Sequence, residues 1–220
     1  MRDPDPKNAY INTIEHIDSE VGRLLKALDD LKLVDNTYVI YTTDNGPWLQ
    51  FRHHGGSAGP LREGKGTTFE GGQRVPCVMR GPGIPAGTVC DELTGTIDVL
   101  PTIAALTGKP LPAGKKIDGM DVSGLWKGTA KKSPRKEFLH YTSRGDLEGI
   151  RSGNWKLLVK KPRRNNAGKA KLHLFDLAKD MGEKNNLAQA KPTVVKELQA
   201  RMKALDAEIM ENSRSPWFKK

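Results

Sequence analysis

The feature of this chain that most restricts its fold is an apolar, partly β-branched run at residues 37–42 that leads into Asp44, Asn45 and Gly46. The run predicts a β-strand with a carboxylate and an amide oxygen just beyond its carboxyl end. In open α/β sheets, this end of a strand is where ligands bind. Two adjacent oxygen donors suit Ca²⁺ or Mg²⁺ better than a soft metal. The run therefore favours an α/β domain with a metal site at Asp44 and Asn45, although Asp-Asn-Gly is also ordinary turn chemistry.

A second feature is the glycine-rich, aperiodic segment of residues 46–74, in which Lys65 lies between Gly64 and Gly66. A loop this long inside a compact domain is usually functional or disordered, and its place after the expected metal strand favours a function. Lys65 offers a mobile positive charge to an anion, and glycine neighbours permit close backbone approach to a ligand. The alternative is a solvated surface charge, which is what most lysines are.

These segments and three others resemble the carboxyl-terminal portion of type I sulfatases of the arylsulfatase A type. The resemblance rests on five stretches of sequence: the helical segment around residues 18–25, the run from residue 35 to Gly46, the lysine loop at residues 59–76, and two later segments at residues 96–108 and 174–187. Any one of them alone is weak, and their combination is specific. The resemblance implies an alkaline-phosphatase-like α/β fold and the hydrolysis of sulfate esters.

The resemblance also implies roles for particular residues. Asp44 would be a charged ligand and Asn45 a neutral ligand of Ca²⁺, with Mg²⁺ as a second possibility. Lys65 would be the catalytic lysine that contacts the sulfate and the breaking ester bond. His54 would line the substrate pocket, although adjacent histidines such as His53 and His54 more often lie on a surface loop.

The family's nucleophile is a formylglycine made from cysteine in a Cys-x-Pro/Ala-x-Arg motif, and this motif is missing here. Cys77 precedes Val-Met-Arg and Cys90 precedes Asp-Glu-Leu, so neither cysteine fits. We therefore expect a fragment with half of an active site, which alone would be inactive. The complete protein would need a formylglycine-generating maturase, act on a sulfated small molecule or polysaccharide, and be periplasmic or secreted. This chain itself shows no signal peptide.

Composition leaves two other functions open. Residues 1–130 carry a net charge of −2 and residues 131–220 a net charge of +12. The basic half could be a non-catalytic module that binds polyanions, but few aromatic residues and no nucleic-acid motif accompany the charge, so we expect no nucleic-acid partner. Solubility or a sulfated substrate explains the charge equally well. A phosphonate or phosphodiester hydrolase of the same superfamily is the other alternative. No run is long enough for a membrane span.

Hydrophobic periodicity predicts two parts. Residues 1–127 would be the carboxyl-terminal part of the catalytic α/β domain, and residues 128–220 an α+β subdomain in which one helix covers an antiparallel sheet. The expected helices are 8–31, 96–108 (closed by Gly108) and one opened by Pro192; the expected strands are 37–42, 75–79, 137–142, 148–151, 155–160 and 171–177. A tight turn is expected at residues 152–154, and a basic loop at residues 161–170.

Four polar residues have structural expectations. Glu70 and Arg74, four residues apart, are expected to form an ion pair that fixes the lysine loop. Asp98 is expected to be a carboxylate at a helix start. His16 is expected to have a structural role at the edge of the first helix's apolar stripe, and the role of His140 stays open.

Overall fold

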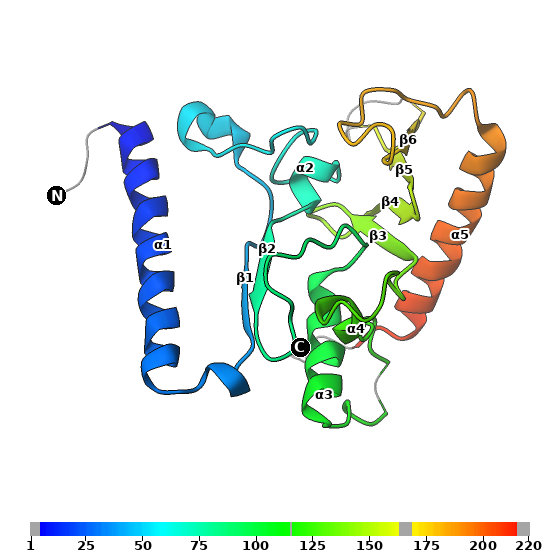
Figure 1. Cartoon of the computed structure of the whole chain (residues 1–220). Coiled ribbons are helices and arrows are strands. Elements are labelled where there is room, and N and C mark those ends of the chain that lie inside the picture. The colour runs from blue at the N-terminus through cyan, green and yellow to red at the C-terminus, as the bar shows by residue number, and fades with distance from the viewer. Residues whose placement is uncertain (1–4, 115, 163–168, 215–220) are drawn as a thin grey trace, which may run out of the picture.

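The computed structural model describes residues 5–114, 116–162 and 169–214, and Figure 1 shows two antiparallel sheets with helices around them. Most of the expected loop at residues 161–170 therefore lies outside the described residues. Within that part of the chain, no helix is long and apolar enough to cross a membrane. The elements, in order, are α1 (Pro6–Asp30), η1 (Val34–Asn36), β1 (Val39–Thr42), η2 (Leu49–His54), α2 (Glu70–Gln73), β2 (Cys77–Arg80), η3 (Thr96–Asp98), α3 (Val99–Thr107), α4 (Ser123–Trp126), β3 (Glu137–Tyr141), β4 (Leu147–Ser152), β5 (Trp155–Lys160), β6 (Lys171–Asp176) and α5 (Pro192–Glu211).

The four-stranded sheet is the best-packed part of the molecule. Its strands follow the chain order β3-β4-β5-β6, each antiparallel to the next, and Gly153 makes the expected tight turn between β4 and β5 with φ +57°. Ile150, Leu157 and Leu174 pack against α5, whose buried residues are Val195, Leu198 and Met202. The expected sheet with one covering helix is therefore confirmed.

The opposite face of this sheet is also covered. Leu158 and Phe175 are fully buried there and pack with Phe69, which comes from the lysine loop. Side chains two residues apart on a strand share a face, so Lys156 lies on this face beside Leu158. The lysine loop thus packs on one face of the sheet, and α5 packs on the other.

The first sheet has two strands within the described residues. There β1 pairs only with β2, and the pairing is antiparallel, with Ile40 opposite Met79. The expected strands at residues 37–42 and 75–79 are therefore both found, and they pair with each other. Asp44 and Asn45 follow β1, as expected. The division into parts at residues 127 and 128 stays a prediction.

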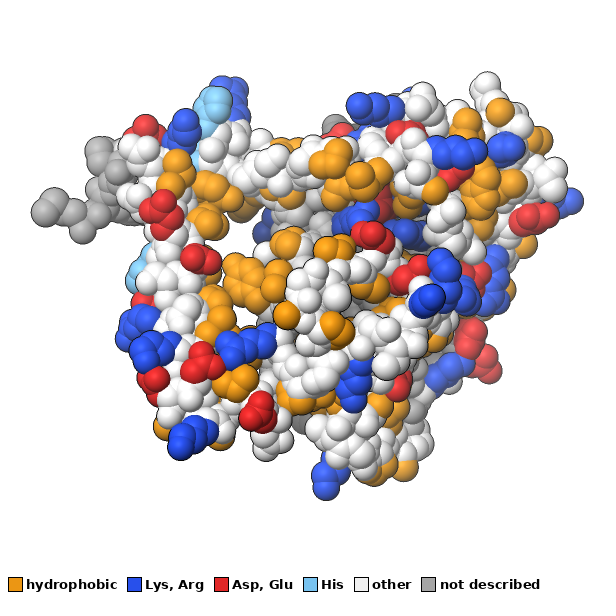
Figure 2. Space-filling view, in the orientation of Figure 1, with side chains coloured by type: hydrophobic (Ala, Val, Ile, Leu, Met, Phe, Trp, Pro, Cys, Tyr) orange, Lys and Arg blue, Asp and Glu red, His pale blue; other side chains and the backbone are white. Residues whose placement is uncertain are grey.

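Helix α1 forms as expected, but its apolar stripe is not buried. None of its residues is buried, and Ile11, Ile14 and Ile17 are 40–48% exposed. Figure 2 shows hydrophobic side chains along the side of α1 that faces the rest of the molecule. His16 is exposed as well, and its structural role at the edge of this stripe stays a prediction.

Asp98 has the expected structural role but a partner that the sequence did not reveal. Its carboxylate accepts hydrogen bonds from the backbone N–H groups of Gly95 and Met120, each at 2.8 Å, and forms a buried ion pair with Arg135. Burial alone would raise the pKa of Asp98. The hydrogen bonds from Arg135, Met120 and Gly95 outweigh burial and lower that pKa below its ordinary value. The helix behind it, α3, ends at Gly108 in the left-handed conformation, as expected.

Candidate active site

Backbone hydrogen bonds join the turn after β1 to the lysine loop. The Gly46 N–H donates to Gly72 O at 3.2 Å, and the Lys65 N–H donates to Pro47 O at 2.9 Å. These two bonds hold the turn after β1 against Lys65 and Gly72 of the lysine loop. The segments that the sequence analysis singled out separately are therefore neighbours in space.

Two glycines are required by this close packing. A Cβ atom on Gly46 would lie 1.7 Å from Gly71 O, and a Cβ atom on Gly64 would lie 2.3 Å from Pro47 O. Both contacts are with backbone, which cannot swing aside. Gly64 beside Lys65 is thus explained by packing within the protein and not by the expected approach to a ligand.

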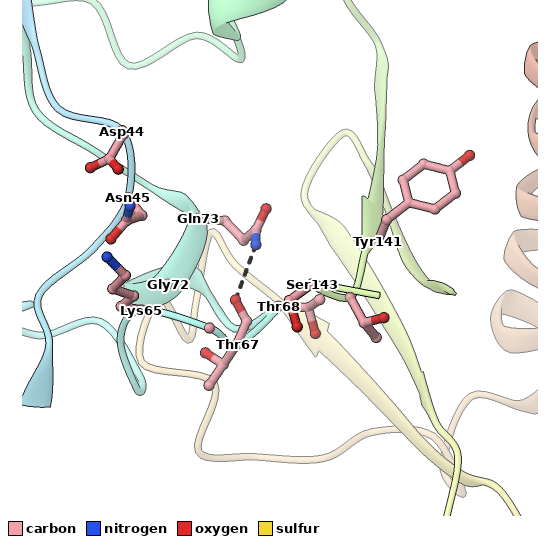
Figure 3. A pocket seen from close by; sticks show the side chains of 11 residues that line it. Asp44, Asn45, Lys65, Thr67, Thr68, Gly72, Gln73, Tyr141 and Ser143 are labelled. Atoms are coloured by element: carbon pink, nitrogen blue, oxygen red, sulfur yellow. Dashed lines mark hydrogen bonds between the residues drawn. The ribbon is translucent and has the colours of Figure 1, made fainter. Parts of the chain in front are cut away.

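An open cavity of about 330 Å³ brings the candidate residues together. Its volume is within the usual range for small-molecule sites. Figure 3 shows Lys65 extending toward Asn45, with Asp44 beyond, on one side of this cavity. The lining residues are Asp44, Asn45, Lys65, Gly66, Thr67, Thr68, Gly72, Gln73, Tyr141, Thr142 and Ser143.

Lys65 is exposed, and its charge faces an aromatic ring. Its Nζ lies 5.1 Å from the ring centroid of Trp48. Among the described residues, Lys65 has no carboxylate partner within ion-pair distance. An ammonium in this state keeps its three donors available to an anion.

The histidines of the same loop do not reach the cavity. His54 is half-buried, and its ring lies 5.4 Å from that of Phe51, which in turn packs edge-on against Trp48 at 4.6 Å. Neither His53 nor His54 is among the lining residues. A substrate contact of His54 therefore stays a prediction without geometric support.

The wall opposite Lys65 comes from a hairpin that the sequence analysis did not connect with the site. Tyr141 ends β3 and Thr142 and Ser143 follow it, far beyond the lysine loop in the sequence. Figure 3 shows the Tyr141 ring directed away from Lys65, and its hydroxyl donates to Asp206 of α5 at 2.8 Å. Burial and this bond raise the pKa of Tyr141. The sequence offered only a strand end here, and strand ends are too common to mark a site.

The expected ion pair between Glu70 and Arg74 is wrong. Arg74 donates to the Met181 sulfur at 3.4 Å, while Glu70 is buried and pairs with Lys156 of β5 at 2.8 Å. The first turn of α2 points its Glu70 side chain into the sheet, and Arg74 is at the exposed end of that helix. Glu70 does fix the lysine loop, but through a partner far away in the sequence.

His140 lies on β3, near the positive charges of β4 and β5. It is buried, and neither of its ring nitrogens has a hydrogen-bond partner. Burial, together with the positive charges of Lys156, Arg151 and Lys160, holds the pKa of His140 well below its ordinary value. His140 is therefore neutral at physiological pH.

The donor set at Asp44 and Asn45 fits part of a hard-cation site. A carboxylate and an amide oxygen follow each other at the edge of a polar cavity, as Ca²⁺ and Mg²⁺ prefer. Among the described residues, no group of three His, Cys, Asp or Glu side chains is placed to hold a metal ion. These two residues could thus supply some of the ligands, and the others would have to come from elsewhere.

Comparison with protein families and curated sequences shows which proteins this chain is similar to. The Sulfatase family matches residues 2–109, and the family of N-sulphoglucosamine sulphohydrolase C-terminal regions matches residues 64–208. Human (Homo sapiens) arylsulfatase A is 38% identical, with 92% of this chain and 45% of that protein covered. Mouse (Mus musculus) steryl-sulfatase is 36% identical, with 84% and 34% covered. The chain therefore spans less than half the length of these relatives.

Solved structures give the same result. The PsFucS1 sulfatase from Pseudoalteromonas sp. has a TM-score of 0.75 at 28% identity, covering 91% of this chain and 43% of that one. The structure of Ps i-CgsB in complex with a neocarrahexaose has a TM-score of 0.79 at 27% identity, covering 99% and 46%. These neighbours are sulfatases, which confirms the expected alkaline-phosphatase-like fold. With a family match over most of its length, this chain belongs to the sulfatase family, as a part that corresponds to the carboxyl-terminal portion of its relatives.

Proposed function

We propose that the protein containing this chain hydrolyses sulfate esters, and that residues 1–220 supply the part of the active site that binds the cation and the sulfate group. The observation that carries the proposal is the shared cavity of Asp44, Asn45 and Lys65. The family match supports it, because the same residues carry the resemblance to type I sulfatases.

Asp44 and Asn45 would hold Ca²⁺, with Mg²⁺ as the alternative ion. Asp44 would contribute a charge and Asn45 a neutral oxygen, and Asp44 is exposed toward the cavity. When bound, such an ion neutralises sulfate oxygens and lowers the pKa of an attacking hydroxyl. The two residues would hold the ion at the edge of the cavity, where the hydrogen bond from Gly46 to Gly72 fixes their turn.

Lys65 would bind sulfate oxygens and stabilise the negative charge that grows on the ester oxygen as the S–O bond breaks. Its exposed ammonium, without a carboxylate partner among the described residues, is suited to this role. A preorganised donor of this kind typically contributes about 10²–10³ in turnover. The nucleophile would be a formylglycine supplied from outside this chain, which is consistent with the two exposed cysteines standing outside the family motif.

The substrate would be a sulfated sugar rather than an apolar sulfate ester. The cavity wall beyond Lys65 carries hydroxyl and amide groups, those of Thr67, Gln73, Thr142 and Ser143. Such a wall can bind the hydroxyl groups of a carbohydrate, which an aryl or steryl group lacks. Two structural relatives are described in complex with a neocarrahexaose and with D-glucosamine-2-N,6-O-disulfate. A maturase that makes formylglycine and a periplasmic or secreted location belong to the same proposal.

The proposal is tested with Asp44→Ala in the full-length protein. We expect loss of Ca²⁺ retention and of turnover on sulfated sugars, because a charged ligand is removed. Asn45→Ala should have the same effect in a milder form. Asp35→Ala, which removes an exposed carboxylate in η1, is the control and should change neither quantity. Unchanged turnover in Asp44→Ala would refute the assignment.

Phosphonate or phosphodiester hydrolysis is the second candidate. A phosphonate monoester hydrolase from Silicibacter pomeroyi has a TM-score of 0.62 at 22% identity, which shows a shared fold and nothing about the reaction. A higher kcat/KM for a phosphonate monoester than for every sulfate ester tested would favour this candidate. The polyanion-binding module would instead be supported by steep salt dependence of heparin binding without turnover.

A further inference from the structure

A buried charge cluster connects the lysine loop to the four-stranded sheet. Lys156 of β5 is fully buried, and its Nζ lies 2.8 Å from Glu70 Oε1 and 3.0 Å from Glu183 Oε1. The second oxygen of Glu70 lies 3.6 Å from Arg151 of β4. Two carboxylates thus face two cations, so the cluster is balanced in charge although it lies among hydrophobic side chains.

Glu183 contacts both ends of the segment that carries Lys65. Its carboxylate accepts a hydrogen bond from the Glu70 N–H at 2.7 Å, and its backbone carbonyl accepts one from Arg62 Nη1 at 2.8 Å. Glu183 is fully buried and has φ +52°, a left-handed conformation that a residue with a side chain adopts at a cost. Because Glu183 is held in this conformation and contacts both Arg62 and Glu70, it fixes the distance between the two ends of residues 63–69.

The cluster is better suited to fixing geometry than to adding stability. Each buried charge loses its hydration, and replacement of a buried ion cluster by apolar side chains is often neutral or stabilising. Neighbouring contacts serve the same segment: Thr68 donates to Glu148 at 2.5 Å and accepts from Lys160 at 2.7 Å. All of these partners come from β4, β5 and the turn after β6, that is, from the sheet.

We propose that Glu183 and Lys156 are positioning residues that fix the Lys65 loop on the four-stranded sheet and thereby place the Lys65 ammonium in its cavity. The part of this inference that concerns catalysis rests on the proposed function. The part that concerns the loop does not, because it can be measured without substrate.

The first test is amide hydrogen exchange in the full-length protein carrying Glu183→Gln. The substitution keeps the size of the side chain and removes its ion pair with Lys156. We expect the amides of residues 64–72 to exchange about tenfold faster or more, the factor expected when a hydrogen bond to a charged group is weakened. If the single variant folds poorly, the double variant Lys156→Met, Glu183→Gln takes its place. It removes one positive and one negative charge and leaves Glu70 to pair with Arg151. The amides of residues 64–72 should exchange faster in it as well.

Two controls separate positioning from general destabilisation. Glu137→Gln weakens an ion pair with Arg201 on the α5 side, and Leu174→Ala opens the core beneath α5. Neither side chain contacts the lysine loop, so exchange should rise near α5 and not at residues 64–72. If Glu183→Gln leaves the exchange of the loop no faster than these controls do, the inference is wrong, whatever the activity.

The second test is kinetic. In Glu183→Gln we expect kcat on a sulfated sugar to fall by up to about 100-fold, as when a catalytic group is misplaced by about 1 Å, with Ca²⁺ retention unchanged. The controls should keep kcat. A faster loop with unchanged kcat would overturn the positioning of Lys65. If the wild type itself hydrolyses no sulfate ester, the proposed function fails, and the exchange result alone decides whether these residues fix the loop.

Discussion

The buried pair of Asp98 and Arg135 allows a quantitative prediction for Asp98→Asn. The side chains are 1% and 6% exposed, and Arg135 would be left with its charge buried and without a carboxylate. Removal of one partner of a buried pair costs about 3–5 kcal/mol of unfolding free energy. The upper part of this range applies, because Asp98 also accepts the N–H groups of Gly95 and Met120, and an amide has only one oxygen to replace two.

The measurement is urea unfolding of the full-length protein, followed by circular dichroism, with Asp30→Asn as the control. Asp30 pairs with Lys26 one helical turn away, but these side chains are 61% and 72% exposed, so its loss should cost less than about 0.5 kcal/mol. A cost for Asp98→Asn no larger than that of the control would refute the reasoning.

The pH dependence of this difference gives an independent check. The pKa of Asp98 lies below its ordinary value of 3.8, so the native state binds fewer protons than the unfolded state in the acidic range. The stabilisation by this carboxylate is therefore complete above about pH 4 and is lost as the pH falls through the folded pKa. The difference between wild type and Asp98→Asn should be constant from pH 7 to 5 and shrink below pH 4.

The remaining predictions concern the cavity and its neighbours. Lys65→Ala should lower kcat by a factor of about 10²–10³ without loss of Ca²⁺. Lys65→Arg should restore little of this activity, because a planar guanidinium does not replace a compact ammonium. Wild-type kinetics in either variant would make Lys65 an ordinary surface charge. His140→Leu should remove an acid sensitivity. The pKa of the buried His140 lies well below its ordinary value, so as the pH falls below about 6.5 the unfolded chain binds a proton that the native state does not. The wild type should therefore lose stability relative to the variant in this acidic range, as urea unfolding at each pH would report. Gln73→Leu should lower kcat/KM for a sulfated sugar more than for an aryl sulfate, and equal losses would contradict a sugar-binding wall.

Local patterns predicted the elements well and their surroundings less well. The strands of the second sheet and α5 agree with the expected ranges, because alternation and helical periodicity reflect burial against one partner. The stripe on α1 has the same periodicity, yet it is exposed here. Helical periodicity indicates that an apolar face packs against a partner, and it does not indicate whether that partner lies within the same 220 residues.

The candidate site shows the same division between local and distant information. Asp44, Asn45 and Lys65 were found from their neighbours in the sequence, and the cavity brings them together. Glu70 was expected to pair with Arg74 because the two lie only four residues apart in the lysine loop, but the short helix α2 turns Glu70 toward Lys156. No local rule predicts a buried lysine in a strand such as β5, since lysine is almost never fully buried unless it is paired. A pair such as Glu70 and Lys156 forms only in the folded protein, where the sheet packs against the loop, and so only the structure reveals it.

The uneven charge of the chain acquires a specific explanation from these contacts. The acidic first part supplies Asp98 and Glu70, and the basic second part supplies their partners, Arg135, Lys156 and Arg151. Carboxylates before residue 128 thus meet buried cations after it behind α3 and under the lysine loop, and Glu92 pairs with Lys132 nearer the surface. Part of the basic excess therefore holds the sheet against the segments that carry Asp44 and Lys65, and these cations are buried or paired. Any polyanion must be bound by other basic residues, so neutralisation of exposed lysines on α5 such as Lys196 and Lys203 should weaken heparin binding without changing the position of the lysine loop.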